Sequence, residues 1–218
     1  MKRLLPLISS LLLVACNSSD SKKVYVDVGF YEDLPYSEIA INSATFSGLG
    51  CPGDKDRYVI SADKKVITLL LDSYIAEAGE GTGVSNSRVT CNMAISLNIP
   101  KGYRAMLINA DFRGAVTLPN AGSLAEFKRE YFFANGSSPI LTDRWDGALE
   151  AEDIQIFDRM SSYGGELSKC GEDVILRSNT SLYISTPTNA ETSEIAIDSL
   201  DFKGSAQLDY RLDYVPCQ

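Results

Sequence analysis

The chain has 218 residues, with 29 acidic and 20 basic side chains, a formal net charge of −9 at pH 7 and no histidine. An acidic protein repels the phosphates that dominate affinity for nucleic acids, so the composition excludes nucleic acid as a partner and suits cationic partners, divalent cations or plain solubility. The lack of histidine excludes Ser-His-Asp and Cys-His catalysis and any histidine ligand for a metal.

The first 15 residues are predicted to be an export signal. Lys2 and Arg3 precede an apolar stretch that is too short to span a bilayer as a mature helix. The stretch ends in LVAC, which resembles the lipobox of bacterial lipoproteins, where the peptidase cuts before a cysteine that becomes acylated. We expect a signal peptide at residues 1–15 and a lipidated Cys16, which leaves 203 residues with a charge of −11. An ordinary secreted protein with an incidental Cys16 is the alternative.

Residues 16–23 are predicted to be a flexible tether between the lipid and the folded domain, because they are small and polar. Asn17 stands where an aspartate would resemble the retention signal for the inner membrane, so we expect the outer membrane of a Gram-negative envelope. Residues 24–218 are long enough for a single β domain with a sizeable core.

The domain is predicted to begin with short strands separated by turns. Glycine and proline clusters mark the turns, and alternating apolar residues mark the strands. The expected elements are a strand at 24–28, a strand at 39–47, an irregular turn at 48–53, a hairpin formed by 57–62 and 65–74, and a mobile acidic loop at 76–85.

The clearest pattern lies between residues 85 and 118. Alternate residues from Val89 to Ile99 are apolar, which is typical of a strand with one buried face, and Cys91 lies on that face. Pro100-Lys101-Gly102 predicts a turn, and a second extended run follows from Tyr103.

The remaining elements are also predicted to be strands. Residues 124–134 contain good helix formers, but their aromatic residues alternate with charged ones, so a strand is favoured. About ten strands with no long helix indicate an antiparallel β-sandwich, for which a jelly roll is one arrangement that fits. The further predictions are a turn at 120–123, strands at 153–157, 173–177, 182–185, 194–201 and 207–214, and loops at 135–139 and 161–171.

Four cysteines remain once Cys16 is assigned to lipid. An even number in an exported protein indicates two disulfides, with three possible pairings, and order along the chain favours Cys51–Cys91 and Cys170–Cys217. Each bridge would contribute about 2–4 kcal/mol, mainly by restricting the unfolded chain.

A short motif, Phe-x-Gly, occurs three times. It lies within TFSG at 45–48, DFRG at 111–114 and DFKG at 201–204. We expect the ring to be buried and the glycine to permit a bulge or bend at a corner of a sheet.

Several sequence blocks together resemble a family of secreted proteins from fungi and bacteria that is grouped as domain of unknown function 4360. The resemblance extends from about residue 39 to the C-terminus and implies a secreted β-rich domain with two bridges in the pairing given above. It implies no activity. The matching blocks are FSGLGCP at 46–52, DSYIA at 72–76, SRVTCN at 87–92, NIPKGY at 98–103, DFRG at 111–114 and CG at 170–171.

The candidate ligand-binding residues lie in an acidic stretch around the only tryptophan. Paired carboxylates there could serve a glycosidase, their oxygens could bind Ca²⁺, or Trp145 could be a platform for a sugar or peptide. A solvated loop in which Trp145 covers the edge of the sandwich is the alternative. The candidates are Asp143, Trp145, Asp146 and Glu150, with Glu152 and Asp153 nearby.

The leading hypothesis is a lipid-anchored envelope protein that binds a ligand or has a structural role without catalysis. Its partners would be the membrane, through the anchor, and a glycan or a protein. A carbohydrate-active hydrolase that uses paired carboxylates and a calcium-stabilised adhesion module are the alternatives. No cofactor other than Ca²⁺ is expected.

Overall fold

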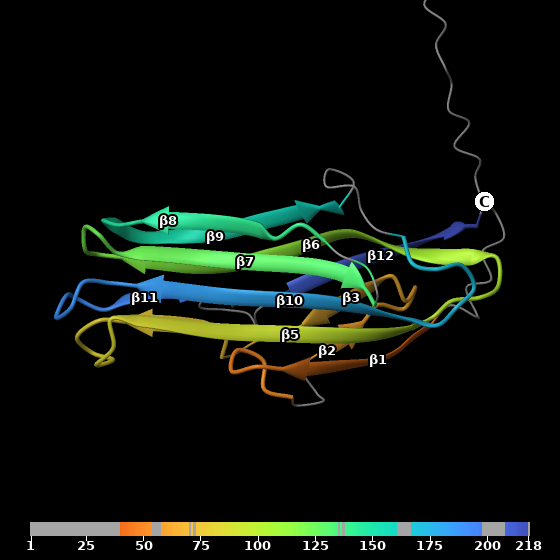
Figure 1. Cartoon of the computed structure of the whole chain (residues 1–218), viewed down its shortest axis with the longest axis horizontal. Coiled ribbons are helices and arrows are strands. Elements are labelled where there is room, and N and C mark those ends of the chain that lie inside the picture. The colour runs from red at the N-terminus through yellow and green to blue at the C-terminus, as the bar shows by residue number, and fades with distance from the viewer. Residues whose placement is uncertain are drawn as a thin grey trace, which may run out of the picture. The chain divides into compact units, whose positions relative to one another are not determined.

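Alternation of apolar and polar residues produces strands throughout the part of the chain that the computed structural model describes (Figure 1). That part lies within the compact unit Pro35–Gln218. It consists of residues 40–53, 58–69, 71, 73–134, 136, 138–160, 167–197 and 208–217.

The described residues contain twelve strands, so the expectation of about ten was close. They are β1 (Ala40–Ser47), β2 (Tyr58–Ile60), β3 (Val66–Leu69), β4 (Ile75–Ala78), β5 (Asn86–Asn98), β6 (Tyr103–Leu118), β7 (Leu124–Phe133), β8 (Leu141–Asp146), β9 (Leu149–Arg159), β10 (Val174–Ser185), β11 (Ser193–Ala196) and β12 (Leu208–Pro216).

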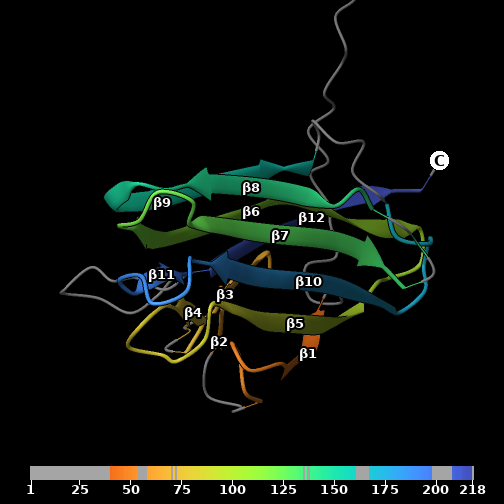
Figure 2. The ribbon, with the colours of Figure 1, turned by 60° about the vertical axis from the view of Figure 1, so that its left-hand side comes forward.

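The strands form two antiparallel sheets that lie in two layers, which confirms the predicted sandwich (Figure 2). One sheet, here called sheet A, has the order β1-β5-β10-β7-β8. The other, sheet B, has the order β2-β3-β12-β6-β11-β4, and β9 pairs with β6 along the side opposite β12. Strands β8 and β9 are therefore edge strands, one in each sheet.

Aromatic rings from both sheets fill the centre of the sandwich. Phe112 of β6 and Phe127 of β7 are fully buried and meet edge to face, with ring centroids 5.0 Å apart. Tyr74 packs edge-on against Phe127, and Tyr210 packs edge-on against Phe112. Because β6 and β7 belong to different sheets, this cluster joins the two layers.

Both disulfides form in the pairing expected from chain order. Cys51–Cys91 ties the turn after β1 to β5, with Cα atoms 5.2 Å apart. Cys170–Cys217 ties the residue after β12 to the segment that precedes β10, with Cα atoms 5.9 Å apart. Cys91 faces the interior, as the alternation predicted.

Several predicted boundaries were wrong, among them that of the strand expected at 65–74, because β3 ends at Leu69. The expected loop at 76–85 begins inside β4, and the stretch 140–160 forms two strands instead of one. Charged residues conceal the first of these strands, β8, because an edge strand can expose polar side chains on much of its length. The two strands expected at 173–177 and 182–185 form one continuous strand, β10.

Polar residues in the middle of β10 explain why the sequence predicted two strands there, and buried hydrogen bonds explain why the structure has one. Its central residues are polar, which the apolar pattern predicts to be a break. Ser178 Oγ lies 2.7 Å from the hydroxyl of Tyr210, and Thr180 Oγ1 donates to the carbonyl oxygen of Cys91 over 2.9 Å. These bonds satisfy the polar groups in the interior, so the strand continues.

The central copy of the Phe-x-Gly motif buries its ring, as expected, and its glycine lies where the backbone of another strand approaches closely. Phe112 is fully buried, and a Cβ atom at Gly114 would collide with the carbonyl oxygen of Ala196. Phe46 of the first copy is half-buried. The copy at 201–204, the expected strand at 24–28, the signal peptide and the tether all lie outside the described residues.

Candidate functional site

The predicted ligand-binding residues lie on the two edge strands but do not form one cluster. Asp143 and Trp145 of β8 pair with Phe127 and Ala125 of β7, whose buried side chains face the other sheet, so both half-buried side chains face the interior. Asp146 is exposed. Glu150, Glu152 and Asp153 are exposed on β9, in the other sheet.

Two of the predicted acids already have basic partners. Asp143 Oδ2 accepts a hydrogen bond from Arg129 Nη2 over 2.6 Å, and its side chain is 44% exposed. Asp146 Oδ1 accepts from Arg144 Nη2 over 3.0 Å at the surface. The structure therefore separates the acidic stretch into an inward-facing part and a solvated part.

Arg129 is the centre of a buried ion pair that the sequence did not reveal. Its side chain is 3% exposed and extends from β7 to Asp158 of β9. Nε lies 2.6 Å from Asp158 Oδ2, and Nη2 lies 3.0 Å from Asp158 Oδ1. Nη1 donates to the carbonyl oxygen of Phe127 over 3.1 Å. This bidentate arrangement links sheet A directly to sheet B.

Tyr131 completes the cluster. Its hydroxyl donates to Asp158 Oδ2 over 2.6 Å. Burial raises the pKa of Tyr131 well above its ordinary value, and nearby Tyr210 and the charge of Asp158 raise it further. Burial alone would lower the pKa of Arg129, but the hydrogen bonds and charge of Asp158 outweigh it, so that pKa is raised.

The interactions of this cluster are those of a structural ion pair that joins the two sheets. Asp158 is 2% exposed and accepts three hydrogen bonds from within the protein. The arginine uses all three of its nitrogens on protein acceptors. Such a pair can hold the sheets together, whereas a catalytic carboxylate must reach a substrate.

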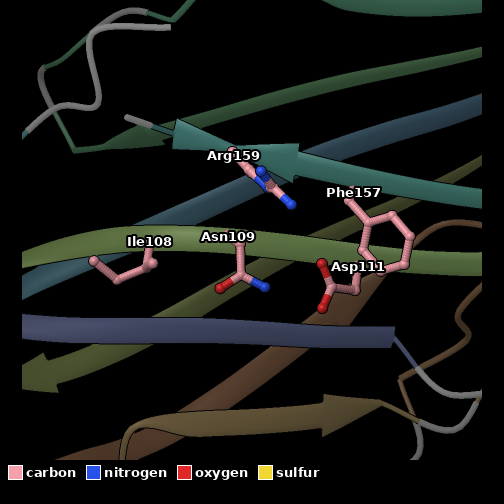
Figure 3. Close-up of a pocket in the computed structure, with 5 residues that line it drawn as sticks. All are labelled: Ile108, Asn109, Asp111, Phe157 and Arg159. Carbon is pink, nitrogen blue, oxygen red and sulfur yellow. The ribbon is translucent and has the colours of Figure 1, made fainter. Parts of the chain in front are cut away.

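A pocket of about 330 Å³ lies elsewhere, on the outer face of sheet B (Figure 3). Phe157 and Arg159 come from β9, and the other lining residues come from β6. Phe157 pairs with Asp111 and Arg159 with Asn109, so these four side chains occupy two adjacent rows across the strands. The lining residues are Ile108, Asn109, Asp111, Phe157 and Arg159.

A bulge in β6 shapes this face. Arg211 of β12 pairs with Asn109, but the next residue, Leu212, pairs with Leu107, so Ile108 is an extra residue in the ladder. A bulge bends its strand and redirects the neighbouring side chains. The side chains of Ile108 and Asn109 thus both line the hollow beside β9.

The pocket combines an aromatic surface with three kinds of polar group. Phe157 is 52% exposed, although large aromatic side chains are normally covered. Its ring lies beside the carboxylate of Asp111, and Asn109 and Arg159 add an amide and a guanidinium (Figure 3). This set can stack on a flat apolar surface and form hydrogen bonds around its rim.

The sequence contained a signal for this pocket that its interpretation missed. Outward-facing positions of β9 are Asp153, Gln155, Phe157 and Arg159, and one aromatic residue on such a polar face is unusual. Asp111 belongs to the DFRG motif, which was interpreted only as a corner.

The described residues contain neither a cluster of metal ligands nor a helix that could span a membrane. No group of three or more cysteine, aspartate or glutamate side chains there could hold a metal ion, and the calcium hypothesis stays a prediction. Within the same residues no helix is long and apolar enough to cross a membrane. Cys16 lies outside them.

Comparison with known proteins assigns the family. The chain belongs to the family described as domain of unknown function (DUF4360), whose model matches residues 37–217. It is 26% identical over 164 residues to a protein of Arthroderma benhamiae that is described as an uncharacterized secreted protein. That match covers 75% of this chain and 66% of the relative. The relative's description as secreted agrees with the export expected from the sequence, and the structure shows the expected β-rich fold and two disulfides.

Two solved structures overlap weakly with the chain. One is TmCBM61 in complex with beta-1,4-galactotriose, with 10% identity, coverage of 82% of this chain and 91% of that one, and a TM-score of 0.25. The other is the enzymatically active domain of tailspike protein 4 from bacteriophage CBA120, with 10% identity, coverage of 84% and 20%, and a TM-score of 0.21. These scores are too low to carry an argument about ligand or activity.

Proposed function

We propose that this protein is a lipid-anchored envelope protein whose β-sandwich binds a saccharide, without catalysis, in the pocket formed by β6 and β9. The observation that carries the proposal is the exposed ring of Phe157 beside Asp111, Asn109 and Arg159. A sugar ring has an apolar face that can pack on an aromatic ring, and its edge carries hydroxyls that donate and accept hydrogen bonds.

The lining and the shallow form of the pocket favour binding over catalysis. Asp111 is the only carboxylate among its lining residues, whereas hydrolysis of a glycosidic bond by the usual route needs two. A shallow hollow on a sheet can bind one or a few sugar units without a structural change. We expect weak, reversible binding that becomes effective when many copies are displayed on a membrane.

The proposal is tested by titrating the exported protein with neutral and acidic oligosaccharides and comparing Phe157→Ala with wild type. Loss of the stacking surface should reduce affinity by at least about tenfold, since aromatic contacts contribute about 1 kcal/mol or more beyond the area that they bury. Unchanged affinity in the variant, or no saccharide binding at millimolar concentrations, would contradict the proposal.

A matched control lies on the outer face of the other sheet. Phe132 of β7 is half-buried there and pairs with the exposed Arg177 of β10. Phe132→Ala removes the same ring from a face with no assigned role, so it should leave saccharide affinity unchanged. Equal loss in both variants would indicate a general effect on folding.

The proposed lipid anchor at Cys16 is tested separately. Cys16→Ser should block lipidation and release the protein from membranes or prevent its processing, because the acyl chains supply about 0.8 kcal/mol per buried CH₂. Unaltered membrane fractionation and electrophoretic mobility would contradict the anchor and leave the pocket proposal intact.

A carbohydrate-active hydrolase is the second candidate, favoured by one observation. Asp143 and Asp158 both accept hydrogen bonds from Arg129 Nη2, so two carboxylates lie close together at the β8–β9 edge, and Asp143 is partly accessible. Glycan turnover that disappears in Asp143→Asn but persists in Phe157→Ala would move the function to this edge. Binding without turnover in the wild-type protein would count against it.

A further inference from the structure

Three exposed arginines lie on the outer face of sheet B, and one of them, Arg159, lines the pocket. Arg159 of β9 and Arg211 of β12 both pair with Asn109 of β6, from opposite sides, so the two arginines flank one row of the sheet. Neighbouring strands are about 4.8 Å apart, which puts their Cα atoms about 10 Å apart. Arg113 lies four residues along β6 from Asn109, about 13 Å away.

Several basic residues elsewhere in the described chain have acidic partners. Arg129 is paired with Asp158 and Asp143, Arg144 with Asp146, and Lys65 with Asp213. No ion pair or hydrogen bond of the side chains of Arg113, Arg159 or Arg211 occurs within the described part of the chain. Within the described residues, therefore, three exposed guanidinium groups without an acidic partner lie on one face of sheet B.

The unpaired arginines have the chemistry of an anion site. A guanidinium presents a planar fork of donors that matches a carboxylate, and charge-assisted bonds of this kind are stronger than neutral ones. Asp111 lies two residues along β6 from Asn109, about 7 Å, and would repel an anion placed beside it. A ligand that fits both features has its negative group at the Arg159–Arg211 row and hydroxyl groups at Asp111.

We infer that the pocket is specific for an acidic saccharide, one whose carboxylate lies between Arg159 and Arg211. Its hydroxyls donate to Asp111, and its ring stacks on Phe157. The inference rests on the proposed function, because it adds a charge preference to the same pocket. A long polyanion without an apolar ring face is disfavoured, since the chain as a whole carries a charge of −9.

The test uses oligouronates in two forms that differ at the carboxyl group, which is charged in one and esterified in the other. Trimers of galacturonate, glucuronate and mannuronate are titrated into the exported protein as free acids and as full methyl esters. At least one free acid should bind about tenfold more tightly than its ester, and the difference should shrink with added salt.

Variants assign the preference to the arginines. Arg159→Ala and Arg211→Ala should each lower affinity for the acid about tenfold and affinity for the ester much less, so the ratio of the two affinities should fall in both variants. The matched control is Arg177→Ala, an exposed arginine beside Phe132 on the outer face of sheet A, which should change neither. Phe157→Ala should weaken both forms.

The outcomes separate this inference from the proposed function. Equal affinity for acid and ester, with both lost in Phe157→Ala, overturns the charge preference and keeps saccharide binding. Tighter binding of the acid that survives both Arg159→Ala and Arg211→Ala overturns the assignment to these residues. If neither form nor any neutral oligosaccharide binds, the proposed function fails and the inference fails with it.

Discussion

Arg129 and Arg159 carry the same guanidinium in opposite settings, one between the two sheets and the other on the outer face of sheet B. Arg129 is buried between the sheets, and every nitrogen of its guanidinium has a protein acceptor. Arg159 is exposed beside a pocket and has no partner within the described residues. The comparison separates charge that holds the fold together from charge that remains available to a ligand.

The two settings imply different costs of mutation. A buried charge that loses its partner must remain unsolvated, whereas an exposed charge is stabilised by water whether or not a partner is present. Substitutions in the cluster of Arg129 should therefore change stability, and substitutions in the pocket should change affinity.

Replacing Arg129 should break the comparison most strongly. Arg129→Met leaves Asp158 buried without its counter-charge, which should cost about 3–5 kcal/mol of unfolding free energy. Urea denaturation measures the change. Arg159→Met, the same substitution on the outer face, should stay within about 0.5 kcal/mol. Equal losses in the two variants would show that the buried setting has no special role.

A double variant sharpens this result. Adding Asp158→Leu to Arg129→Met removes the orphaned charge together with its partner, and well-packed apolar replacements of buried pairs are often neutral. We expect most of the lost stability to return. Failure to recover would mean that the pair contributes favourable energy beyond the avoidance of an unpaired charge.

The disulfide that closes the turn after β1 should come second. Replacing both Cys51 and Cys91 by alanine removes a bridge that spans 40 residues, and the expected loss is about 2–4 kcal/mol. Thermal denaturation and urea denaturation both report it. An unchanged melting temperature would contradict a constraint on the unfolded chain by this bridge.

High pH should weaken the interior through Tyr131. Burial raises its pKa in the folded protein above the ordinary value near 10, so the unfolded chain loses the phenolic proton first. The stabilisation is complete below about pH 10 and declines as the pH rises through the folded pKa, with a slope of about 1.4 kcal/mol per unit. Tyr131→Phe should make unfolding free energy less dependent on pH above 10. An identical pH profile would contradict the assignment.

Asp143 should have the smallest effect of the cluster. Its carboxylate is 44% exposed, so water screens its attraction to Arg129, and Asp143→Asn should cost about 1 kcal/mol or less. A loss as large as that of Arg129→Met would mean that Asp143, instead of Asp158, is the main partner of the arginine.

The sequence predicted the features that depend on local patterns. The alternation from Val89 to Ile99 gave the strand β5, and Pro100-Lys101-Gly102 gave the turn into β6. Chain order and the family resemblance gave both disulfides. Each of these depends on residues close in sequence or on the small number of cysteines in an exported protein.

The features that were missed depend on residues that only the fold brings together. Arg129 and Asp158 are 29 residues apart and face each other because their strands lie in opposite sheets. The row of Arg159, Asn109 and Arg211 needs the order of three strands and the bulge at Ile108. The sequence alone does not show whether a charged residue is a solvated surface group, a member of a buried ion pair or part of a binding site.

Trp145 shows that sequence alone can also indicate a site where the fold does not form one. A lone tryptophan among acids was the natural candidate for a site, yet the fold turns it toward the interior at the edge of the sandwich and pairs Asp143 with Arg129. Among the described residues the exposed large aromatic side chain is that of Phe157, which lies inside an ordinary predicted strand.

The most direct test is a map of amide chemical shifts in the exported protein as an oligosaccharide that binds is added. If the pocket on the outer face of sheet B is the binding site, the largest changes will occur at residues 108–111 of β6 and 157–159 of β9. Changes centred on Asp143 and Trp145, with the pocket unperturbed, would contradict that assignment and move the site to the β8–β9 edge.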